Sequence, residues 1–437
     1  MVPTFVRESP YRMNPILRLA YTLSLAVALM FIPILALFNE KVRRWWKARK
    51  VSPPIPPPDR PVFWLHCASV GEFEQGRPVI EYLLRQLPYQ PYLVITFFSS
   101  SGWLRYGETC PLGDWVGPAP TDTPWVVKRW VSRLRPKVAF FVKYDLWPNL
   151  LHQLKEHGCA IYLLAAHVEP LKGFRWWWRR QLLSYVEWIF VQTEGDAQKL
   201  RHSGFSQVTV AGDSRLIRVK QLAEDWLPVS GIQEWVGSSF VIVAGSVWGT
   251  DVQFLARAYE QLRGYNIRWI LAPHEVSPKQ IEYIHKTWPV RCAQYSQSEW
   301  DNSRDTLILD TMGLLAYSYF YAHAVWIGGG FERGIHNILE AVVYKKPIFF
   351  GPKYQDFPEA HELIALKIAE SCKYPMSFSN AIKSLIKDRR RLSVIAEKAS
   401  IYLESKPQTQ EIVWQRLRNA PWVITSPVTN QAIQENT

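Results

Sequence analysis

The chain has 437 residues, of which 48% are hydrophobic and 20% are charged, and this composition excludes a disordered or fibrous protein. A mean hydropathy of −0.12 excludes a protein with many membrane spans, and the length predicts two or three domains. The net charge of +13 predicts an anionic partner: a nucleic acid, an acidic lipid or an anionic substrate. Five cysteines without any C-x-x-C pair argue against a disulfide framework or a zinc site and indicate a reducing compartment.

The first distinctive segment is residues 19–38, LAYTLSLAVALMFIPILALF, which contain no charged side chain. As a helix they would extend about 30 Å, the thickness of one hydrocarbon core. The segment lacks the short apolar core and small-residue cleavage site of a signal peptide, which favours a retained anchor. A buried helix of a soluble domain is one alternative. Pro33 permits another, a kinked helix that lies in one leaflet. We predict a membrane-attached protein.

Basic residues flank this segment unequally. Three arginines precede it and six basic residues follow it: Arg7, Arg12 and Arg18, then Lys41, Arg43, Arg44, Lys47, Arg49 and Lys50. The positive-inside rule therefore predicts that the rest of the chain lies on the cytoplasmic side of the membrane.

The remaining sequence alternates apolar runs with helical patterns. The runs are residues 62–68, 92–98, 138–144, 160–166, 188–193 and 208–212 in the first half, and 240–246, 268–274, 306–310, 324–330 and 347–352 in the second. They are continuously apolar, as is typical of parallel strands covered on both faces. Two successive βαβ domains predict a ligand site at the carboxyl ends of their strands, in a cleft between them.

We therefore predict an α/β fold of the GT-B class, with two Rossmann-like parallel-sheet domains that face a cleft and follow an N-terminal membrane helix. The expected parts are an anchor with a basic flank (1–50), a Pro-rich linker (51–61), a first Rossmann-like domain (62–230), a second Rossmann-like domain (231–405), and a C-terminal helix and tail (406–437). The domain boundary should fall within residues 221–239, a polar and aromatic stretch. A fold by itself does not define a reaction.

The run at 62–68 leads into Ser69, Gly71 and Glu72 at a predicted helix start. Ser-x-x-Glu in this place is typical of a capping box, in which Glu72 would only complete the first turn. The alternative is functional, because the carboxyl end of a parallel strand is where ligands collect and a carboxylate there can act as a general base.

The second half contains the sequence GGGFERGIHNILE at residues 328–340. A strand, a glycine loop and a helix start together predict an anion site, with Glu340 one turn into the helix, where it could accept ribose hydroxyls. The spacing is neither that of a dinucleotide fingerprint nor that of a P-loop. The alternative is a glycine-rich turn in which Asn337 caps a helix.

Three further turns end strands at the same predicted edge: residues 245–246, 273–275 and 310–313. Four such turns along one sheet edge indicate a nucleotide pocket. No D-x-D pair that would hold Mg²⁺ against a sugar diphosphate occurs. His274, Glu275 and His336 form a weak metal-ligand alternative, since they come from distant loops.

Taken in order, these motifs resemble those of the 3-deoxy-D-manno-octulosonic acid (Kdo) transferases, which attach Kdo from CMP-Kdo to the lipid A precursor. The motifs are residues 69–72 (SVGE), 144–149 (YDLWPN), 212–215 (GDSR), 273–275 (PHE), 310–313 (DTMG) and 334–340 (GIHNILE). With the apolar segment, the resemblance covers essentially the whole chain. It implies an inverting, metal-independent GT-B enzyme of lipopolysaccharide biosynthesis at the cytoplasmic face of the inner membrane, with no cofactor.

The resemblance also implies roles for particular residues. Glu72 corresponds to the general base, and Asp145 and Arg215 correspond to contacts with the transition state or the donor carboxylate. The implied CMP contacts are Pro273, His274, Thr311, Met312, Gly313, Asn337, Ile338, Leu339 and Glu340. The sequence departs from the family pattern at Lys143 and Ile335, where Glu and Gly are common. Asp145 and Arg215 replace the usual Glu and Lys, and Arg and Lys are not interchangeable.

The implied partners are CMP-Kdo, a phosphorylated lipid A precursor and the membrane surface, without nucleic acid. Acceptor-side candidates are the basic residues around Trp176, Trp177 and Trp178, namely Lys172, Arg175, Arg179 and Arg180. A solvated basic helix is the alternative, but three exposed tryptophans in a row would be costly in water. Two other functions stay open: a GT-B transferase that uses a UDP-sugar and a lipid acceptor, and a membrane-tethered nucleic-acid-binding protein. The second lacks the sequence signatures of nucleic-acid-binding folds.

Overall fold

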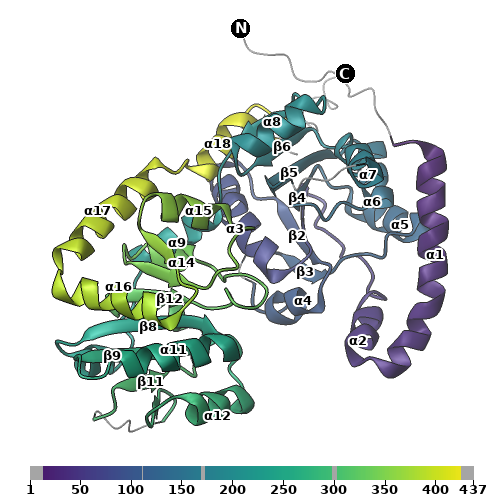
Figure 1. Ribbon diagram of the computed structural model, residues 1–437. Helices are drawn as coiled ribbons and strands as arrows, with labels where there is room; N and C mark the ends of the chain where they lie inside the picture. The colour runs from purple at the N-terminus through teal and green to yellow at the C-terminus, as the bar shows by residue number, and fades with distance from the viewer. Residues whose placement is uncertain (1–12, 111, 169–172, 298–302, 425–437) are drawn as a thin grey trace, which may run out of the picture. The chain divides into compact units, whose positions relative to one another are not determined.

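The computed structural model describes residues 13–110, 112–168, 173–297 and 303–424. Contacts between Cα atoms divide the chain into two compact units. Unit 1 comprises Met1–Arg215 and Pro407–Thr437, and unit 2 comprises Leu216–Lys406. Each unit contains one seven-stranded parallel sheet with helices packed against it (Figure 1).

The sheet of unit 1 has the strand order β3-β2-β1-β4-β5-β6-β7. Its strands are β1 (Val62–Cys67), β2 (Tyr92–Phe97), β3 (Trp115–Pro118), β4 (Val138–Val142), β5 (Ala160–Ala166), β6 (Trp188–Val191) and β7 (Val208–Val210). The helices along this unit are α3 (Val70–Gln86), α4 (Ser100–Tyr106), α5 (Pro124–Leu134), α6 (Pro148–Glu156), α7 (Gly173–Leu183) and α8 (Glu194–His202). Alternate residues of β1 enter two different hydrophobic clusters, Trp64 on one face and Phe63 with Leu65 on the other. The prediction of strands covered on both faces is therefore confirmed.

The sheet of unit 2 has the strand order β10-β11-β9-β8-β12-β13-β14. Its strands are β8 (Phe240–Val247), β9 (Ile267–Pro273), β10 (Ala293–Gln294), β11 (Thr306–Ile308), β12 (Ala324–Ile327), β13 (Ile348–Phe350) and β14 (Ala369–Ser371). Its helical segments are α9 (Arg215–Glu224), α10 (Ile232–Val236), α11 (Gly249–Gln261), α12 (Pro278–Thr287), α13 (Leu315–Ser318), η1 (Tyr319–Tyr321), α14 (Leu339–Val342), α15 (Pro358–Ala365), α16 (Pro375–Lys387) and α17 (Arg390–Ser405). The predicted pair of parallel-sheet domains is thus confirmed.

The apolar runs used to predict strands do not include β3, β10 or β14. All three lie at sheet edges and have two to four residues. A short edge strand has one neighbour and needs no long apolar run, so its pattern is weak.

The division between the units differs from the predicted boundary in residues 221–239. Unit 1 ends at Arg215, because α9 places Leu216 and Val219 in the hydrophobic core of unit 2. The end of the chain belongs to unit 1, where α18 (Thr409–Leu417) packs against α3 and is followed by α19 (Pro421–Ile424). Val413 and Leu417 of α18 are buried there.

The apolar N-terminal segment forms α1 (Pro15–Phe38), which Asn14 caps by accepting the Ile16 N–H at 2.9 Å. A second helix, α2 (Glu40–Ala48), follows after Asn39 and packs against α1 as a hairpin. Within this hairpin α1 contacts α6 and α2 contacts α4 of unit 1 (Figure 1). The length and apolar composition of α1 would allow it to cross a membrane.

Candidate active site

Glu72 lies in the first turn of α3, at the carboxyl end of β1. Its Oε2 accepts the Ala68 N–H at 2.5 Å, whereas the Ser69 hydroxyl makes no capping hydrogen bond. The capping-box interpretation is therefore wrong. In a capping box the serine hydroxyl accepts a helix N–H and the glutamate carboxylate accepts the serine N–H. Among the described residues, Oε1 of Glu72 has no hydrogen-bond partner, so this oxygen is available to a ligand.

Burial is the main influence on Glu72 and raises the pKa of its carboxyl above the usual range. The Ala68 N–H opposes this shift, and the Asp145 carboxylate adds to it. Smaller contributions from Lys143 and His66 lower the pKa. A carboxylate with a raised pKa is a stronger base than one in water, which suits removal of a proton from a hydroxyl.

Asp145 follows β4 and is held by a chain of buried hydrogen bonds. His66 Nε2 lies 2.9 Å from Asp145 Oδ2, and His66 Nδ1 lies 2.9 Å from Thr96 Oγ1. Trp64 Nε1 donates to the same Thr96 oxygen at 2.8 Å. Since a carboxylate only accepts, Nε2–H of His66 must donate to Asp145. The chain therefore fixes the Asp145 carboxylate near Glu72.

The sequence analysis missed His66. It is 1% exposed and stands inside a continuous apolar strand, where a single histidine in an otherwise apolar run was the available signal. Its partner Thr96 is on the neighbouring strand β2, which the sequence cannot show.

Arg215 is engaged in an ion pair with Asp213. Its Nε lies 2.8 Å from Asp213 Oδ2, and its Nη2 lies 2.5 Å from the same oxygen. The Ser214 hydroxyl donates to the Gln75 carbonyl of α3 at 2.5 Å, which attaches this loop to the helix that carries Glu72. The loop is therefore fixed beside α3 at a position three residues after Glu72, and Asp213 of the same loop partly neutralises the charge of Arg215.

The predicted acceptor cluster lies mainly on α7. Lys172 is outside the described residues, and Arg175 and Arg180 are exposed. Of the three tryptophans, only Trp177 is exposed, at 39%; Trp176 and Trp178 pack against the core of unit 1. A solvated basic helix therefore exposes one tryptophan here and not three, so the cost expected for that alternative does not arise. Helical spacing turns two of the three rings toward the protein.

Two arginines lie beside the loop that carries Asp145. The Arg179 guanidinium is 4.1 Å from the centre of the Tyr144 ring, and that of Arg49 is 3.6 Å from the Trp45 ring. Arg49 Nη2 donates to the Phe98 carbonyl at 2.9 Å. Within the described part of the chain, Nη1 of each arginine is buried without a hydrogen-bond partner. Buried unpaired donors are costly, so both groups fit an anionic ligand.

In unit 2, three aromatic rings gather where β8 and β9 end. The rings of His274 and His336 are stacked with centroids 4.2 Å apart, and the Trp248 ring lies 4.5 Å from that of His274. Trp248 Nε1 donates to His336 Nε2 at 2.8 Å. Burial, with a smaller contribution from the neighbouring His274, lowers the pKa of His336 to about 4. Partial burial also lowers the pKa of His274, against the opposing effect of Glu275. The stack is therefore uncharged at neutral pH.

The glycine loop after β12 is shaped by close backbone contacts. A Cβ on Gly328 would lie 2.2 Å from the Ser246 carbonyl oxygen, and one on Gly330 would lie 2.6 Å from the Gly351 nitrogen. Gly329 has φ +90°, which favours glycine. Buried Asp251 accepts the Gly329 N–H at 2.8 Å. Two of the three glycines are thus required by close packing against neighbouring loops. The sequence analysis did not identify Asp251, whose carboxylate holds the loop through the Gly329 N–H.

The helix expected after this loop is short. α14 has four residues, and Glu340 is its second, so the predicted position of Glu340 one turn into the helix is wrong. Asn337 Nδ2 donates to Glu340 Oε1 at 2.9 Å, which orients the carboxylate. Ile338 and Leu339 are buried in the hydrophobic core, at 0% and 1% exposure, so only their backbone could reach a nucleotide.

The remaining predicted donor contacts also lie at the carboxyl ends of strands in unit 2. Pro273 is the last residue of β9 and is buried, whereas His274 after it is exposed. Thr311, Met312 and Gly313 form a turn after β11, in which Met312 is 72% exposed and Gly313 has φ +89°. The sheet order therefore brings these turns to one edge of unit 2.

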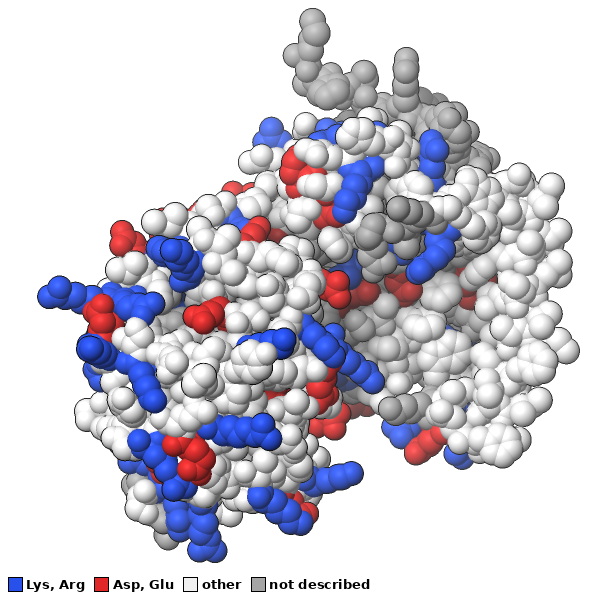
Figure 2. Space-filling model, viewed as in Figure 1, with Lys and Arg blue, Asp and Glu red and all other residues white. Residues whose placement is uncertain are grey.

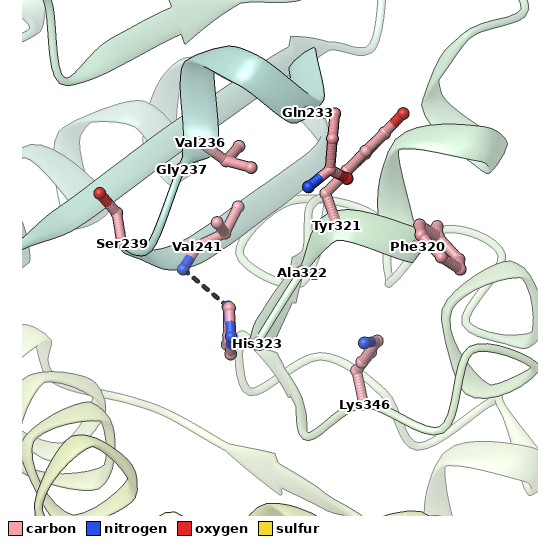
Figure 3. Close-up of a pocket in the computed structure, with 10 residues that line it drawn as sticks. All are labelled: Gln233, Val236, Gly237, Ser239, Val241, Phe320, Tyr321, Ala322, His323 and Lys346. Atoms are coloured by element: carbon pink, nitrogen blue, oxygen red, sulfur yellow. Dashed lines mark hydrogen bonds between the residues drawn. The ribbon is translucent and has the colours of Figure 1, made fainter. Parts of the chain in front are cut away.

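A cavity of about 220 Å³ lies at the other edge of this sheet, where β8 and β12 begin (Figure 3). His323, Lys346 and Val241 are among its lining residues, and the Val241 N–H donates to His323 Nδ1 at 3.1 Å. Burial lowers the pKa of His323 to about 4. Ligands of parallel sheets collect at the carboxyl ends of strands, so this cavity is separate from the predicted donor site.

Within the described residues, no group of three His, Cys, Asp or Glu side chains is placed to hold a metal ion.

Comparison with known proteins identifies relatives along most of the chain. Residues 43–218 match the family model described as 3-deoxy-D-manno-octulosonic-acid transferase. The Kdo transferase of Chlamydia muridarum is 23% identical over 395 residues, covering 87% of this chain and 91% of that protein. The Kdo transferase of Rickettsia typhi is 24% identical over 343 residues, with 76% and 73% covered. The resemblance carried by the motifs is therefore confirmed.

The fold has a similarly broad match among solved structures. A glycosyltransferase from Rickettsia africae superposes with a TM-score of 0.58 at 10% identity, covering 83% of this chain and 100% of that one. Identity at this level concerns the fold alone. With the two parallel sheets, it confirms the GT-B class.

Proposed function

We propose that this relative of the Kdo transferases transfers Kdo from CMP-Kdo to a hydroxyl of a phosphorylated lipid A precursor, in lipopolysaccharide biosynthesis. Transfer would occur with inversion and without a metal ion, at the cytoplasmic face of the inner membrane. The observation that carries the proposal is the Glu72 carboxylate, which is half-buried at the carboxyl edge of its sheet, has a raised pKa and keeps one oxygen unpartnered among the described residues.

In this proposal Glu72 takes the proton of the acceptor hydroxyl as that oxygen attacks the anomeric carbon of Kdo. The bond between this carbon and the CMP phosphate oxygen breaks, and CMP leaves. Burial supports the role of Glu72, because a carboxyl with a raised pKa holds the proton more readily than one in water. Asp145 and Arg215 would contact the donor sugar or the transition state, and the bonds from His66 and Asp213 would hold them in place.

The acceptor would lie on unit 1, near the loop of Asp145. Arg179 and Arg49 flank this loop, and each has a buried Nη1 group without a partner among the described residues. We assign these two donors to anionic groups of the acceptor, since a phosphate or carboxylate would satisfy them. Arg175 and Arg180 are exposed and would act at longer range through their charge.

CMP would bind to unit 2. The rings of Trp248, His274 and His336 supply an uncharged aromatic surface of the type on which a base can stack. Glu340, oriented by Asn337, would accept hydroxyls of the ribose. Thr311, Met312 and Gly313 would contribute the exposed turn beside them.

The direct test is to incubate the full chain with CMP-Kdo, generated in place, and a phosphorylated lipid A precursor. A mass increase of the lipid by one or more Kdo units is expected, and an unchanged lipid would contradict the proposal. Omission of the sugar donor provides the control. Addition of a chelator should leave the rate unchanged if no metal ion takes part.

Nucleotide protection separates the proposal from transfer of a UDP-linked sugar. CMP should raise the melting temperature of the protein, because a ligand that binds only the folded state stabilises it. UDP at the same concentration should not. Protection by UDP alone would favour the UDP-sugar alternative.

A further inference from the structure

The N-terminal hairpin is attached to unit 1 near both of its ends. At the start of α1, Met13 is buried in a hydrophobic core of unit 1, and Leu17 packs against the same cluster. The Thr22 hydroxyl lies 3.1 Å from Asn149 Nδ2 of α6, and the Tyr21 ring lies 5.9 Å from that of Trp178 in α7. The first third of α1 is therefore docked on the same unit that carries Glu72.

The other end of the hairpin is held by aromatic and cationic contacts. The Trp45 and Phe98 rings meet edge to face at 5.8 Å, and Arg49 donates to the Phe98 carbonyl. Phe98 also stacks on Trp147, with ring centroids 5.1 Å apart. Trp147 is two residues after Asp145, so this end of the hairpin is connected through Phe98 to the loop of the candidate site.

Asn149 connects the beginning of α1 to the same loop. Its Nδ2 donates to the Asp122 carbonyl at 2.7 Å as well as to Thr22. The Asp122 carboxylate accepts the N–H groups of Asn149 and Leu150 at 3.0 and 2.7 Å, and so caps α6 from outside. α1 is thus bonded directly to the start of α6, four residues after Asp145.

A helix that crosses a bilayer has its two ends on opposite sides of the hydrocarbon core, about 30 Å apart. Here the beginning of α1 and the segment after its end both contact one folded unit. We infer that α1 lies lengthwise in one leaflet of the membrane, with the hairpin as part of unit 1, and does not span the bilayer.

The surface of α1 that faces away from unit 1 supports lipid as its partner. It exposes large apolar side chains from end to end: Ile16, Leu19, Leu23, Val27, Met30, Phe31, Ile34, Leu35, Leu37 and Phe38. In Figure 2, which has the same view as Figure 1, the surface at the right-hand side of the molecule, where α1 lies, carries almost no charged side chains. Such a face would be unstable in water and suits burial of a helix at the headgroup and acyl boundary.

Charge complementarity favours an anionic lipid surface over a protein partner. Arg43, Arg44, Lys47 and Lys50 on and after α2 are exposed, and so are Arg175 and Arg180 on α7. Phe174, at 68% exposure, and Trp177 lie beside these arginines. Exposed cations with aromatic side chains next to an apolar helix face are typical of interfacial membrane contacts.

The inference describes how the proposed transferase is attached to its membrane, and in this respect it rests on the proposed function. Its test does not, because the depth of α1 in a membrane can be measured without substrate. We would introduce single cysteines at Leu19, Val27 and Leu37, in a background with Cys110 and Cys292 replaced by serine. Each cysteine would be spin-labelled, and the protein bound to vesicles that contain anionic phospholipid. Collision rates with oxygen and with a water-soluble nickel chelate then report the depth of each label.

An in-plane helix places all three labels at similar, shallow depth. A spanning helix places Val27 about 12 Å deeper than Leu19 and correspondingly deeper than Leu37, and that result would overturn the inference. Full access of all three labels to the nickel chelate would also overturn it, since lipid would then not cover the face. Shielding of the labels before vesicles are added would identify a protein occupant and would count against lipid. A label at exposed Glu397 in unit 2 is the aqueous control.

Failure of this test would leave the proposed transfer reaction intact, because detergent-dispersed acceptor does not require a particular depth of α1. Absence of Kdo transfer together with three shallow labels would instead contradict the proposed function alone.

Discussion

The carboxyl edge of the first sheet carries two neighbouring carboxylates, whereas that of the second carries stacked neutral rings and glycines beside the carboxylate of Glu340. Glu72 and Asp145 of unit 1 are close enough to interact electrostatically, and buried His66 donates a hydrogen bond to Asp145. In unit 2 the corresponding positions hold Trp248 and His336, and burial keeps the histidine neutral. The same parallel-sheet scaffold thus presents a proton acceptor in one unit and an aromatic binding surface in the other.

Both edges hold a non-glycine residue in the left-handed region. Lys143, with φ 58°, follows β4, and Ser246, with φ 53°, lies in an irregular part of β8. Such conformations cost free energy and persist where the surrounding structure fixes them. The Lys143 N–H donates to the Leu164 carbonyl at 2.9 Å, which fixes the turn before Asp145. Each unit therefore constrains the backbone at its candidate ligand edge.

Glu72→Gln should give the largest effect and test whether the charged edge performs the chemistry. Loss of the proton acceptor should lower kcat by about 10²–10⁴-fold. Thermal protection by CMP should persist, since the predicted nucleotide contacts belong to unit 2. Glu74→Gln is a matched control on the same helix, where Glu74 accepts from the Tyr106 hydroxyl. Near-normal turnover of Glu72→Gln, or equal losses in both variants, would contradict the role of Glu72.

His66→Leu should show whether the buried chain behind Asp145 positions that carboxylate. Misplacement of a reacting group by about 1 Å can cost ~10²-fold in rate, and we expect a loss of kcat up to this size. The amide of His66→Gln can still donate to Asp145, so this variant should recover part of the loss at similar thermal stability. If both variants lose the same activity in proportion to their stability, His66 has a structural role only.

Arg49→Met should separate the acceptor contact from the chemical step. A hydrogen bond to a charged group contributes about 1.5–3 kcal/mol, so KM for the acceptor should rise roughly tenfold or more with little change in kcat. Arg43→Met is the control, because Arg43 is an exposed residue of the same hairpin. An unchanged KM in Arg49→Met would remove Arg49 from the acceptor site, and a matching rise in Arg43→Met would indicate a general charge effect.

The histidines of unit 2 predict the smallest effect, a dependence of stability on pH. The pKa values of His336 and His323 are lowered to about 4 in the folded protein, so the unfolded chain binds protons first as pH falls. This contribution to the free energy of unfolding is complete above about pH 6.5 and is lost as the pH approaches 4. The melting temperature should fall by a few degrees across this window. His336→Gln should flatten the dependence, and an unchanged slope would contradict the neutral state of the stack.

Much of the fold follows from the sequence, because long apolar runs are a local property of a strand buried on both faces. The strands at the centre of each sheet, including β1 and β8, match their predicted runs closely. The short edge strands β3 and β14 lack such runs and depend on a neighbour for their hydrogen bonds. The apolar composition of α1 is also local, so its helix was predictable.

The functional motifs were local in the same sense: Glu72, Asp145 and the glycine loop could be named because each occupies a few consecutive residues. What only the tertiary structure decided are contacts between distant segments. His66 holds Asp145 across 79 positions, Trp248 donates to His336 across 88, and Thr22 meets Asn149 across 127. The sequence established that α1 is apolar enough for lipid, but its docking on α6 depends on side chains brought together by folding. A periodic pattern reports the burial of a residue, and it carries no information about which distant polar group becomes its partner.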